Sequence, residues 1–131
     1  MTIVQNSKQD KTRVKRSICP ISIGLEQFGD KWTLLLIRDL MFGAKRFKDF
    51  ETRPEKIPTN ILASRLKMLE QNGLVEKNLY QERPKRYEYS LLDKGRDVIP
   101  VLQTIAKWSI KHDDESYQPS EKFWTADKSE P

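Results

Sequence analysis

The fold is decided by one stretch, residues 59–91, which reads TNILASRLKMLEQNGLVEKNLYQERPKRYEYSL. In its first part, residues 59–72, leucines recur at helical spacing, and Gly73 follows where a helix C-cap is expected. The hydrophobic period then changes. Residues 74–80 and 86–91 have the short, alternating pattern of β-strands, and the polar stretch between them is typical of a turn. The stretch therefore predicts one helix followed directly by a β-hairpin.

Apolar periodicity predicts further helices on both sides of this stretch. Three precede it, over residues 20–28, 31–42 and 46–52, and one follows it, over residues 94–111. Residues 31–42 are apolar on nearly every face, so this helix is expected at the centre of the core. Four helices, a hairpin and a last helix, with a short third helix, make the order of a winged helix-turn-helix. We expect a mainly α fold with a small antiparallel β-hairpin as its wing.

Length and composition restrict the class of protein. A chain of 131 residues is expected to fold as one domain, and a hydrophobic content of 37% is too high for a disordered chain. The longest apolar run, residues 32–37, is far shorter than the ~18 residues of a membrane span, and we expect no signal segment. One Cys excludes an internal disulfide framework, which favours the cytoplasm. One His with one Cys leaves no His/Cys-rich metal site.

Charge divides the chain into three parts. The formal net charge is +5, but residues 113–131 hold six acidic and two basic side chains, a local balance of −4. The other 112 residues therefore carry +9. Such a basic body most often binds nucleic acid, sometimes an acidic membrane surface, and otherwise is only a soluble basic surface. We expect a basic, mobile arm at residues 1–16, a folded domain at residues 17–112 and an acidic C-terminal tail at residues 113–131.

The helix predicted over residues 59–72 has a polar face that suits the DNA major groove. A helix enters that groove only with a face free of core residues. Asn60, Ser64 and Lys67 lie opposite the leucine stripe on a helical wheel. Asn60 and Ser64 can hydrogen-bond base edges, and Lys67 can reach guanine or phosphate. Thr59 adds a hydroxyl at the helix N-terminus, where the helix dipole favours phosphate. We expect these four residues at the bases; the alternative is the solvated face of any amphipathic helix.

Basic residues flank this helix on both sides in the predicted fold. One group starts the preceding helix and consists of Lys45, Arg46 and Lys48. The other lies at the hairpin tip and consists of Arg83, Lys85 and Arg86. Both positions straddle the groove in a winged domain. We therefore expect these side chains on DNA phosphates, where they supply affinity rather than specificity.

Residues 19–112 resemble the HxlR-type family of bacterial and archaeal winged-helix regulators. The resemblance rests on motifs in a fixed order, among them Cys19-Pro20, Gly29-Asp30-Lys31-Trp32-Thr33-Leu34-Leu35-Leu36, Arg46-Phe47, Arg65-Leu66, Asn72-Gly73-Leu74-Val75 and Tyr87-Glu88-Tyr89-Ser90-Leu91. It implies a homodimeric transcription regulator that binds palindromic operators and joins through its first and last helices. The last helix agrees, because Ile99 and Ala106 add apolar surface beyond its main stripe.

Three positions near the helix starts depart from the family pattern. Many members have Gly at the position of Lys56, Ser at that of Pro58 and Thr at that of Leu92. Since Pro58 has no hydroxyl, we expect Thr59 to cap the recognition helix, which then begins one residue later. We expect Asp93 to cap the last helix in place of the missing Thr.

The C-terminal tail lies outside the resemblance. Residues 116–131 are acidic overall but contain the aromatic pair Phe123-Trp124. Two predictions stay open: the aromatic pair docks on the dimer, or the tail is disordered.

Cys19 is the candidate redox site. It stands directly before Pro20, a residue type that prefers the first position of a helix, so its thiol is expected beside the unpaired amides of a helix start. That position, with Lys15 and Arg16 nearby, lowers a thiol pKa and makes the thiol reactive. The resemblance implies a sensing Cys at this place, although several thiol-sensing members use a second Cys that this chain lacks. The alternative is that Cys19 packs as a small hydrophobic residue.

The sequence favours a DNA-binding transcription regulator over an enzyme. It has no phosphate-cradling glycine loop, and no base is paired with Cys19, since the single His, His112, ends the last helix. We expect no catalytic residue, no metal, no cofactor and no membrane, and we expect duplex DNA and a second copy of the chain as partners. Two alternatives stay open. One is a regulator that answers a small ligand, with Cys19 structural; the other is a nonspecific architectural DNA-binding protein.

Overall fold

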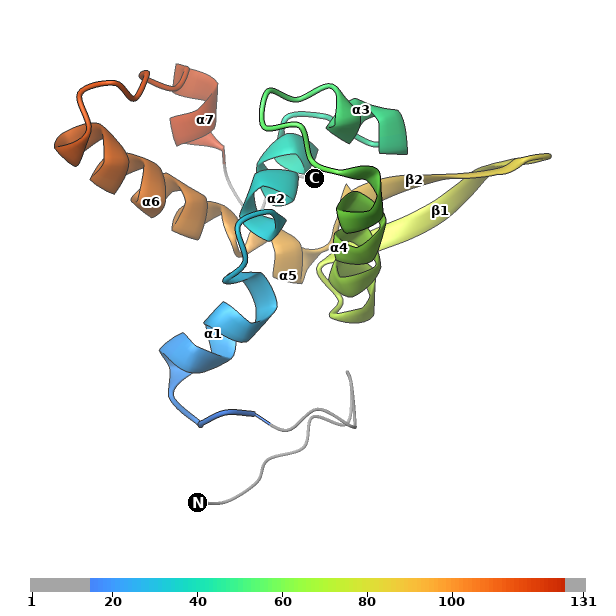
Figure 1. The fold of residues 1–131 in the computed structure, drawn as a ribbon, viewed down its shortest axis with the longest axis horizontal. Coiled ribbons are helices and arrows are strands. Elements are labelled where there is room, and N and C mark those ends of the chain that lie inside the picture. Colours follow the sequence, from blue (N-terminus) through green and yellow to red (C-terminus); the bar gives the residue numbers. More distant parts are fainter. Residues whose placement is uncertain (1–14, 127–131) are drawn as a thin grey trace.

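The computed structural model describes residues 15–126, which form a mainly α-helical fold with one antiparallel hairpin (Figure 1). In chain order its elements are α1 (Pro20–Phe28), α2 (Thr33–Met41), α3 (Phe47–Glu51), α4 (Thr59–Gln71), β1 (Val75–Glu82), β2 (Lys85–Leu91), α5 (Asp93–Arg96), α6 (Ile99–His112) and α7 (Glu121–Thr125). This order confirms the winged helix-turn-helix predicted from the sequence. The arm predicted at residues 1–16 lies outside the described residues except for its last two. In the described part, no helix has both the length and the apolar character to cross a membrane.

Helix α2 lies at the centre of the fold, as its apolar sequence predicts. Ile37 is fully buried, and Leu40 is nearly so. The turn before the helix is held by Asp30, whose carboxylate accepts hydrogen bonds from the backbone N–H of Trp32 (3.0 Å) and of Thr33 (3.1 Å). Asp30 therefore holds the turn ahead of α2, and the regular helix begins at Thr33.

The core forms where α2, α3, α4 and the base of the hairpin meet. The leucine stripe of α4 faces inward, and Phe50 of α3 is fully buried with it. The largest buried side chains are those of Phe50, Leu36, Ile37, Leu62, Leu66, Leu69, Leu74 and Val75. Since α4 supplies three of these leucines, packing of the core determines which face of α4 is left to solvent.

The hairpin is longer than predicted. Its ladder runs from the base, where Val75 pairs with Leu91, to the tip, where Glu82 pairs with Lys85. The pairing continues into the polar stretch, and the side-chain amide of Gln81 donates to the carbonyl of Pro84 at 3.1 Å. The prediction of a turn over residues 81–85 is therefore wrong: Arg83 and Pro84 alone connect the strands. The longer ladder carries the tip away from the helices (Figure 1).

The last helix is divided, which corrects the prediction of one helix over residues 94–111. A short helix, α5, comes first, and α6 begins at Ile99. The break has its physical reason in Pro100, which has no backbone N–H and would clash with the carbonyl group one turn earlier inside a continuous helix. The structure places Pro100 in the first turn of α6, where no such N–H is needed.

Two predicted helix caps are wrong. Thr59 is the first helical residue of α4, and the cap position is taken by Pro58 without a side-chain hydrogen bond. The proline ring fixes φ near the observed −62°, which suits the extended backbone of a cap even without a hydroxyl. Asp93 is likewise the first residue of α5, and its carboxylate pairs with Arg96 instead of capping the helix.

The described part of the C-terminal tail packs against the helices of its own chain. In α7, Phe123 is 7% exposed and lies beside Phe42, at the end of α2, with ring centroids 6.2 Å apart. Gln103 of α6 donates from Nε2 to the carbonyl of Phe123 at 2.9 Å. The aromatic pair therefore docks on its own chain, and docking on a dimer stays a prediction.

We predict that Gly95→Ala destabilises the protein. A Cβ at residue 95 would lie 2.3 Å from the carbonyl oxygen of Leu74 and 2.9 Å from the side chain of Leu91, at the base of the hairpin. The backbone must move to admit it, which lowers the free energy of unfolding by about 1–3 kcal/mol. Urea unfolding measures this change.

The matched control is Gly24→Ala in α1. Its Cβ would lie 3.5 Å from the nearest atom, in the Phe28 ring, and Ala favours a helix over Gly by about 1 kcal/mol. Stability should therefore hold or rise in this variant. Equal unfolding midpoints for Gly95→Ala and the wild type would contradict the close approach of α5 to the hairpin.

Candidate nucleic-acid interface

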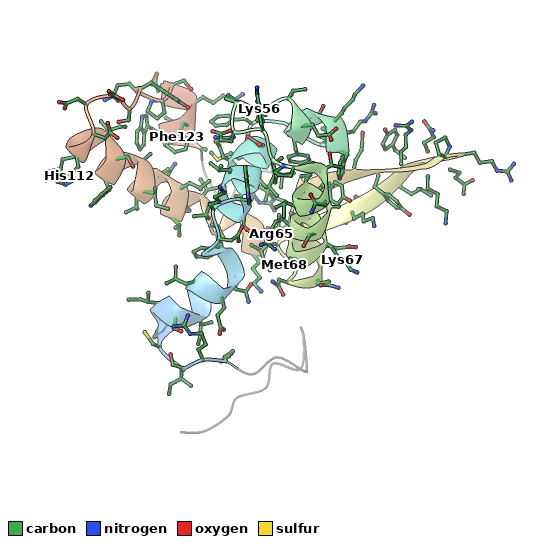
Figure 2. The ribbon with its side chains drawn as sticks, in the orientation of Figure 1. Lys56, Arg65, Lys67, Met68, His112 and Phe123 are labelled. Carbon is green, nitrogen blue, oxygen red and sulfur yellow. The ribbon has the colours of Figure 1, made fainter. Side chains whose placement is uncertain are left out.

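Helix α4 presents the polar face that the sequence predicts. Its leucine stripe is buried, and the side chains of Asn60, Ser64 and Lys67 are exposed on the opposite face. Lys67 lies on the second half of the helix (Figure 2). These three residues come from successive turns, so together they form one polar strip along α4.

Arg65 fixes α4 relative to the start of α2. Its Nε donates to Oδ2 of Asp30 at 3.0 Å, the same oxygen that accepts the backbone N–H groups before α2. Its second guanidinium nitrogen contacts Sδ of Met68 at 3.2 Å (Figure 2). Partial burial opposes ionisation of Asp30, but the hydrogen bonds from Thr33 and Trp32 and the charge of Arg65 hold its pKa below the ordinary value. Sequence reasoning missed this pair because helical periodicity does not predict contacts between distant segments.

Thr59 joins the first turn of α4 to the end of α3. Its hydroxyl donates to Oε2 of Glu51 at 3.1 Å. The predicted phosphate-facing hydroxyl is therefore hydrogen-bonded within the free protein. A DNA phosphate at this helix end would have to compete with the Glu51 carboxylate for the same proton.

The hairpin tip carries its predicted basic group into solvent. Arg83, Lys85 and Arg86 are all exposed. Arg83 lies in the turn, and Lys85 and Arg86 are the first two residues of β2. The hairpin extends beyond the helical body (Figure 1), so their charges lie at the far end of the wing.

In the basic group at the start of α3, Arg46 contacts the hairpin. The guanidinium of Arg46 pairs with Glu88 of β2, Nε to Oε2, at 3.0 Å. It also lies over the ring of Tyr80, 4.1 Å from the centroid. Lys45 and Lys48 are exposed. The charge of Arg46 thus has a carboxylate partner already, which the sequence alone did not indicate.

Residues from both basic groups meet in one groove. The groove lies between α3 and the hairpin and has a volume of about 500 Å³. Its basic and aromatic lining consists of Arg46, Phe47, Lys48, Lys85, Arg86, Tyr80, Tyr87 and Tyr89. Glu51, the partner of Thr59, also lines it, so the groove adjoins the N-terminal end of α4. Guanidinium and ammonium groups beside tyrosines suit a sugar-phosphate strand.

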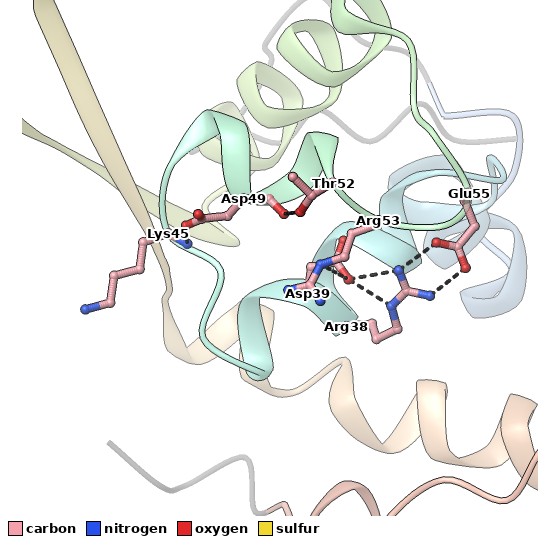
Figure 3. A network of polar contacts seen from close by, with 7 residues as sticks. All are labelled: Arg38, Asp39, Lys45, Asp49, Thr52, Arg53 and Glu55. Carbon is pink, nitrogen blue, oxygen red and sulfur yellow. Dashed lines mark hydrogen bonds and ion pairs between the residues drawn. The ribbon is translucent and has the colours of Figure 1, made fainter.

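An ion network holds the loop that leads into α4 (Figure 3). Arg38 of α2 donates two hydrogen bonds to Glu55 of this loop, at 2.9 and 3.0 Å, and pairs with Asp39 at 2.8 Å. Arg53, also in the loop, faces Asp39 with Nε 3.5 Å from Oδ1. Burial raises the pKa of Asp39, and the charge of Arg38 opposes that rise. In the sequence, this network could have been anticipated from Asp39, an acidic residue within the apolar run of α2.

The same loop contains a strained residue. Lys56 has φ of +55°, in the left-handed region that favours glycine (Figure 2). This is the position at which many members of the resembling family have Gly. The tight turn before α4 is therefore kept here with a Lys, at a cost in backbone strain.

Cys19 takes the N-cap position of α1, as predicted, and is exposed. The backbone N–H groups of Ser22 and Ile21 point to the thiol and lower its pKa. The alternative that Cys19 packs as a small hydrophobic residue does not hold in the single chain. Among residues 15–126, no cluster of three or more His, Cys, Asp and Glu side chains could hold a metal ion.

The first and last long helices leave apolar side chains in solvent. Helix α1 buries none of its residues, and its Ile21 and Leu25 are 73% and 54% exposed. On α6, Trp108 is 66% exposed and Ile105 is 47% exposed. Both helices lie on the side of the molecule away from the hairpin (Figure 1). Apolar exposure of this kind is typical of a protein–protein interface.

Comparison with known proteins gives a family and a set of structural neighbours. The family model described as HxlR-like helix-turn-helix matches residues 27–117. An uncharacterized HTH-type transcriptional regulator of Methanothermobacter thermautotrophicus is 32% identical over 105 residues, which are 80% of this chain and 80% of that protein. Among solved structures, the protein PA1607 superposes with a TM-score of 0.70 at 34% identity, covering 81% of this chain and 75% of its own.

Two further neighbours are named as regulators with redox forms. The reduced form of the transcriptional regulator YodB from Bacillus subtilis has a TM-score of 0.62 at 33% identity, covering 77% of this chain and all of YodB. The redox regulator HypR in its reduced form has a TM-score of 0.67 at 32% identity, covering 76% of this chain and all of HypR.

These likenesses extend over the parts that build the interface. The matched residues include the recognition helix α4, the whole hairpin and α6. The fold, the order of elements and the sequence motifs agree with one another. The chain belongs to the HxlR-like helix-turn-helix family of transcriptional regulators.

Proposed function

We propose that this chain is a dimeric transcription regulator that binds inverted-repeat operator DNA. Helix α4 enters the major groove, where Asn60, Ser64 and Lys67 meet the base edges and Thr59 lies at the helix end nearest a phosphate. The proposal rests on one observation, that the polar strip of α4 lies beside the basic groove. Thr59 at the start of α4 is hydrogen-bonded to Glu51, and Glu51 lines the groove. Helix α4 and the neighbouring groove thus offer base contacts and phosphate contacts side by side.

Phosphate contacts come from both basic groups. Lys85 and Arg86 share the groove with Arg46 and Lys48, while Lys45 and Arg83 extend its charge beyond the lining. On DNA, a phosphate takes the place of Glu88 at the Arg46 guanidinium. The affinity that these charge contacts supply falls as the salt concentration rises.

The dimer forms through α1 and α6. Their exposed Ile21, Leu25 and Trp108 supply an apolar surface that a second copy covers. Residues 17–112 act as the DNA-binding and dimerisation domain, with the arm at residues 1–16 and the tail at residues 113–131 outside it. A regulator of chromosomal DNA of this kind acts in the cytoplasm.

Redox or electrophile control through Cys19 is a second element of the proposal. The thiol is exposed, its pKa is lowered by the start of α1, and α1 belongs to the proposed dimer surface. The similarity to YodB and HypR supports this element. A group attached to Sγ would change how the two copies meet, and so the distance between their recognition helices.

We predict that Asn60→Ala and Ser64→Ala each weaken operator binding by about 1–3 kcal/mol while binding to random DNA changes little, because base contacts discriminate among sequences. Mobility-shift titrations on operator and random duplexes measure the difference. The matched control is Thr104→Ala, which removes an exposed hydroxyl from α6, remote from α4. Equal losses on both duplexes would place Asn60 and Ser64 at phosphates instead.

We predict that replacing Arg83, Lys85 and Arg86 together by Gln weakens binding to all sequences alike. The slope of log K against log salt concentration should become shallower by roughly 0.9 for each phosphate that no longer has a basic partner. A charge-matched control replaces Lys107, Lys111 and Lys122, which are exposed on α6 and α7. If the two triple variants have the same slope, the hairpin tip does not meet the DNA backbone.

We predict that iodoacetamide modifies Cys19 in the folded protein near neutral pH faster than it modifies an unstructured thiol of pKa about 8.5. Mass spectrometry over time gives both rates. An oxidant or a quinone should then alter operator affinity in the wild type but not in Cys19→Ser, and reductant should restore the oxidised form. Modification only after denaturation, or an equal response of Cys19→Ser, would remove Cys19 as the sensor.

A further inference from the structure

A cavity lies between α2, α6 and the tail segment that leads into α7. Its volume is about 580 Å³. Small-molecule sites in proteins enclose about 300–1,000 Å³ and are lined mainly by apolar side chains with a few polar groups. Leu35, Phe42, Leu102, Ile105 and Phe123 give this cavity such a lining.

The tail builds the outer wall of the cavity and is attached to α6 at both ends. At the near end, Ser116 donates from its hydroxyl to the carbonyl of Asp113 at 2.8 Å and to that of Ser109 at 3.3 Å. At the far end, Gln103 donates to the carbonyl of Phe123 at 2.9 Å. The segment between these two points therefore spans the cavity.

The charges around the cavity favour an uncharged occupant. Arg38 lines it, but its guanidinium is already paired with Glu55 and Asp39. An anion would have to displace those carboxylates, and Glu115 at the rim would repel it. The hydroxyls of Ser109 and Ser120 offer hydrogen bonds without charge. Phe42, Phe123 and Tyr117 offer rings, so the lining suits an aromatic molecule.

Arg38 also connects the cavity to the DNA-binding side. Its side chain borders the cavity, and its guanidinium donates both hydrogen bonds to Glu55 in the loop before α4 (Figure 3). Figure 2 labels one residue at each end of this connection: Phe123, which lines the cavity, and Lys56, which lies in the loop. A molecule packed against the stem of Arg38 would therefore act on the position of the loop that starts the recognition helix.

We infer that the cavity between α2, α6 and residues 115–123 binds a small, uncharged aromatic molecule, and that its occupancy changes DNA affinity through the Arg38–Glu55 pair. The evidence for the binding site is the cavity and its lining. The regulatory part rests on the proposed function, since it needs a chain that binds DNA.

The site is tested with N-phenyl-1-naphthylamine, an uncharged aromatic dye whose fluorescence rises in apolar surroundings, added to the full-length protein. We expect saturable enhancement in the wild type and its loss in Ser109→Phe, because the ring fills the cavity from the α6 wall. Glu76→Phe is the matched control, since it places the same ring at an exposed position of β1, outside the cavity and outside the apolar surface of α1 and α6. Enhancement that survives in Ser109→Phe would place the dye on exposed apolar surface and overturn the site, as would no enhancement in the wild type.

A second measurement on the wild type does not depend on any variant folding. Backbone amide resonances of residues 102–110 and 115–123 should shift as the dye is added, and those of the hairpin tip should not. Shifts confined to α1 and to Trp108 would show that the dye binds the apolar surface proposed for the dimer, which contradicts the cavity.

The regulatory part is tested by operator binding with and without the dye. The dye should change operator affinity in the wild type and not in Ser109→Phe. Glu55→Gln should still bind the dye but lose the change in affinity, because the charge that joins Arg38 to the loop is gone. Dye binding without any change in wild-type affinity overturns the regulatory part. Dye binding in a chain that binds no DNA supports the site and overturns the proposed function.

Discussion

The carboxylate of Asp30 joins the central helix α2 to α4, the helix that we propose to read DNA. One of its oxygens accepts the backbone N–H groups that open α2 and the guanidinium of Arg65 from α4. Helices α2 and α4 are therefore held in place by hydrogen bonds to the same carboxylate oxygen. Because the leucine stripe of α4 is buried against α2 and α3, rotation of α4 about its own axis is excluded as well. The polar strip that faces solvent is a consequence of these two constraints.

The three functions that we propose lie on separate surfaces of the molecule. The α4 strip and the basic groove lie toward the hairpin, and the apolar faces of α1 and α6 lie on the other side (Figure 1). The cavity lies between α2, α6 and the tail. Arg38 is the contact that joins the cavity to the loop before α4, while Cys19 stands at the start of α1. A bound ligand would therefore act on α4 through Arg38, and a modification of the thiol would act through α1.

Periodic features of the fold were predictable from sequence, and long-range pairings were not. The leucine stripe of α4 and the two strands of the hairpin depend on local spacing, and both predictions are confirmed. The break before α6 follows from Pro100, which is placed in the first turn of a helix. This is a local preference, but the apolar pattern continues across the break and favoured one continuous helix. The pairing of Arg46 with Glu88 and the packing of Phe123 depend on tertiary contacts, for which spacing gives no signal. The DNA contacts assigned to individual side chains stay predictions.

We propose that a dimer reads two half-sites of the operator with its two α4 helices. Hydroxyl-radical footprinting of the full-length protein, on a fragment selected from genomic DNA, tests it most directly. We expect two protected windows on one face of the duplex, related as an inverted repeat, with centres about one helical turn (roughly 10–10.5 base pairs) or a multiple of it apart. A single asymmetric window protected by a monomer, or protection without a preferred site, would contradict it.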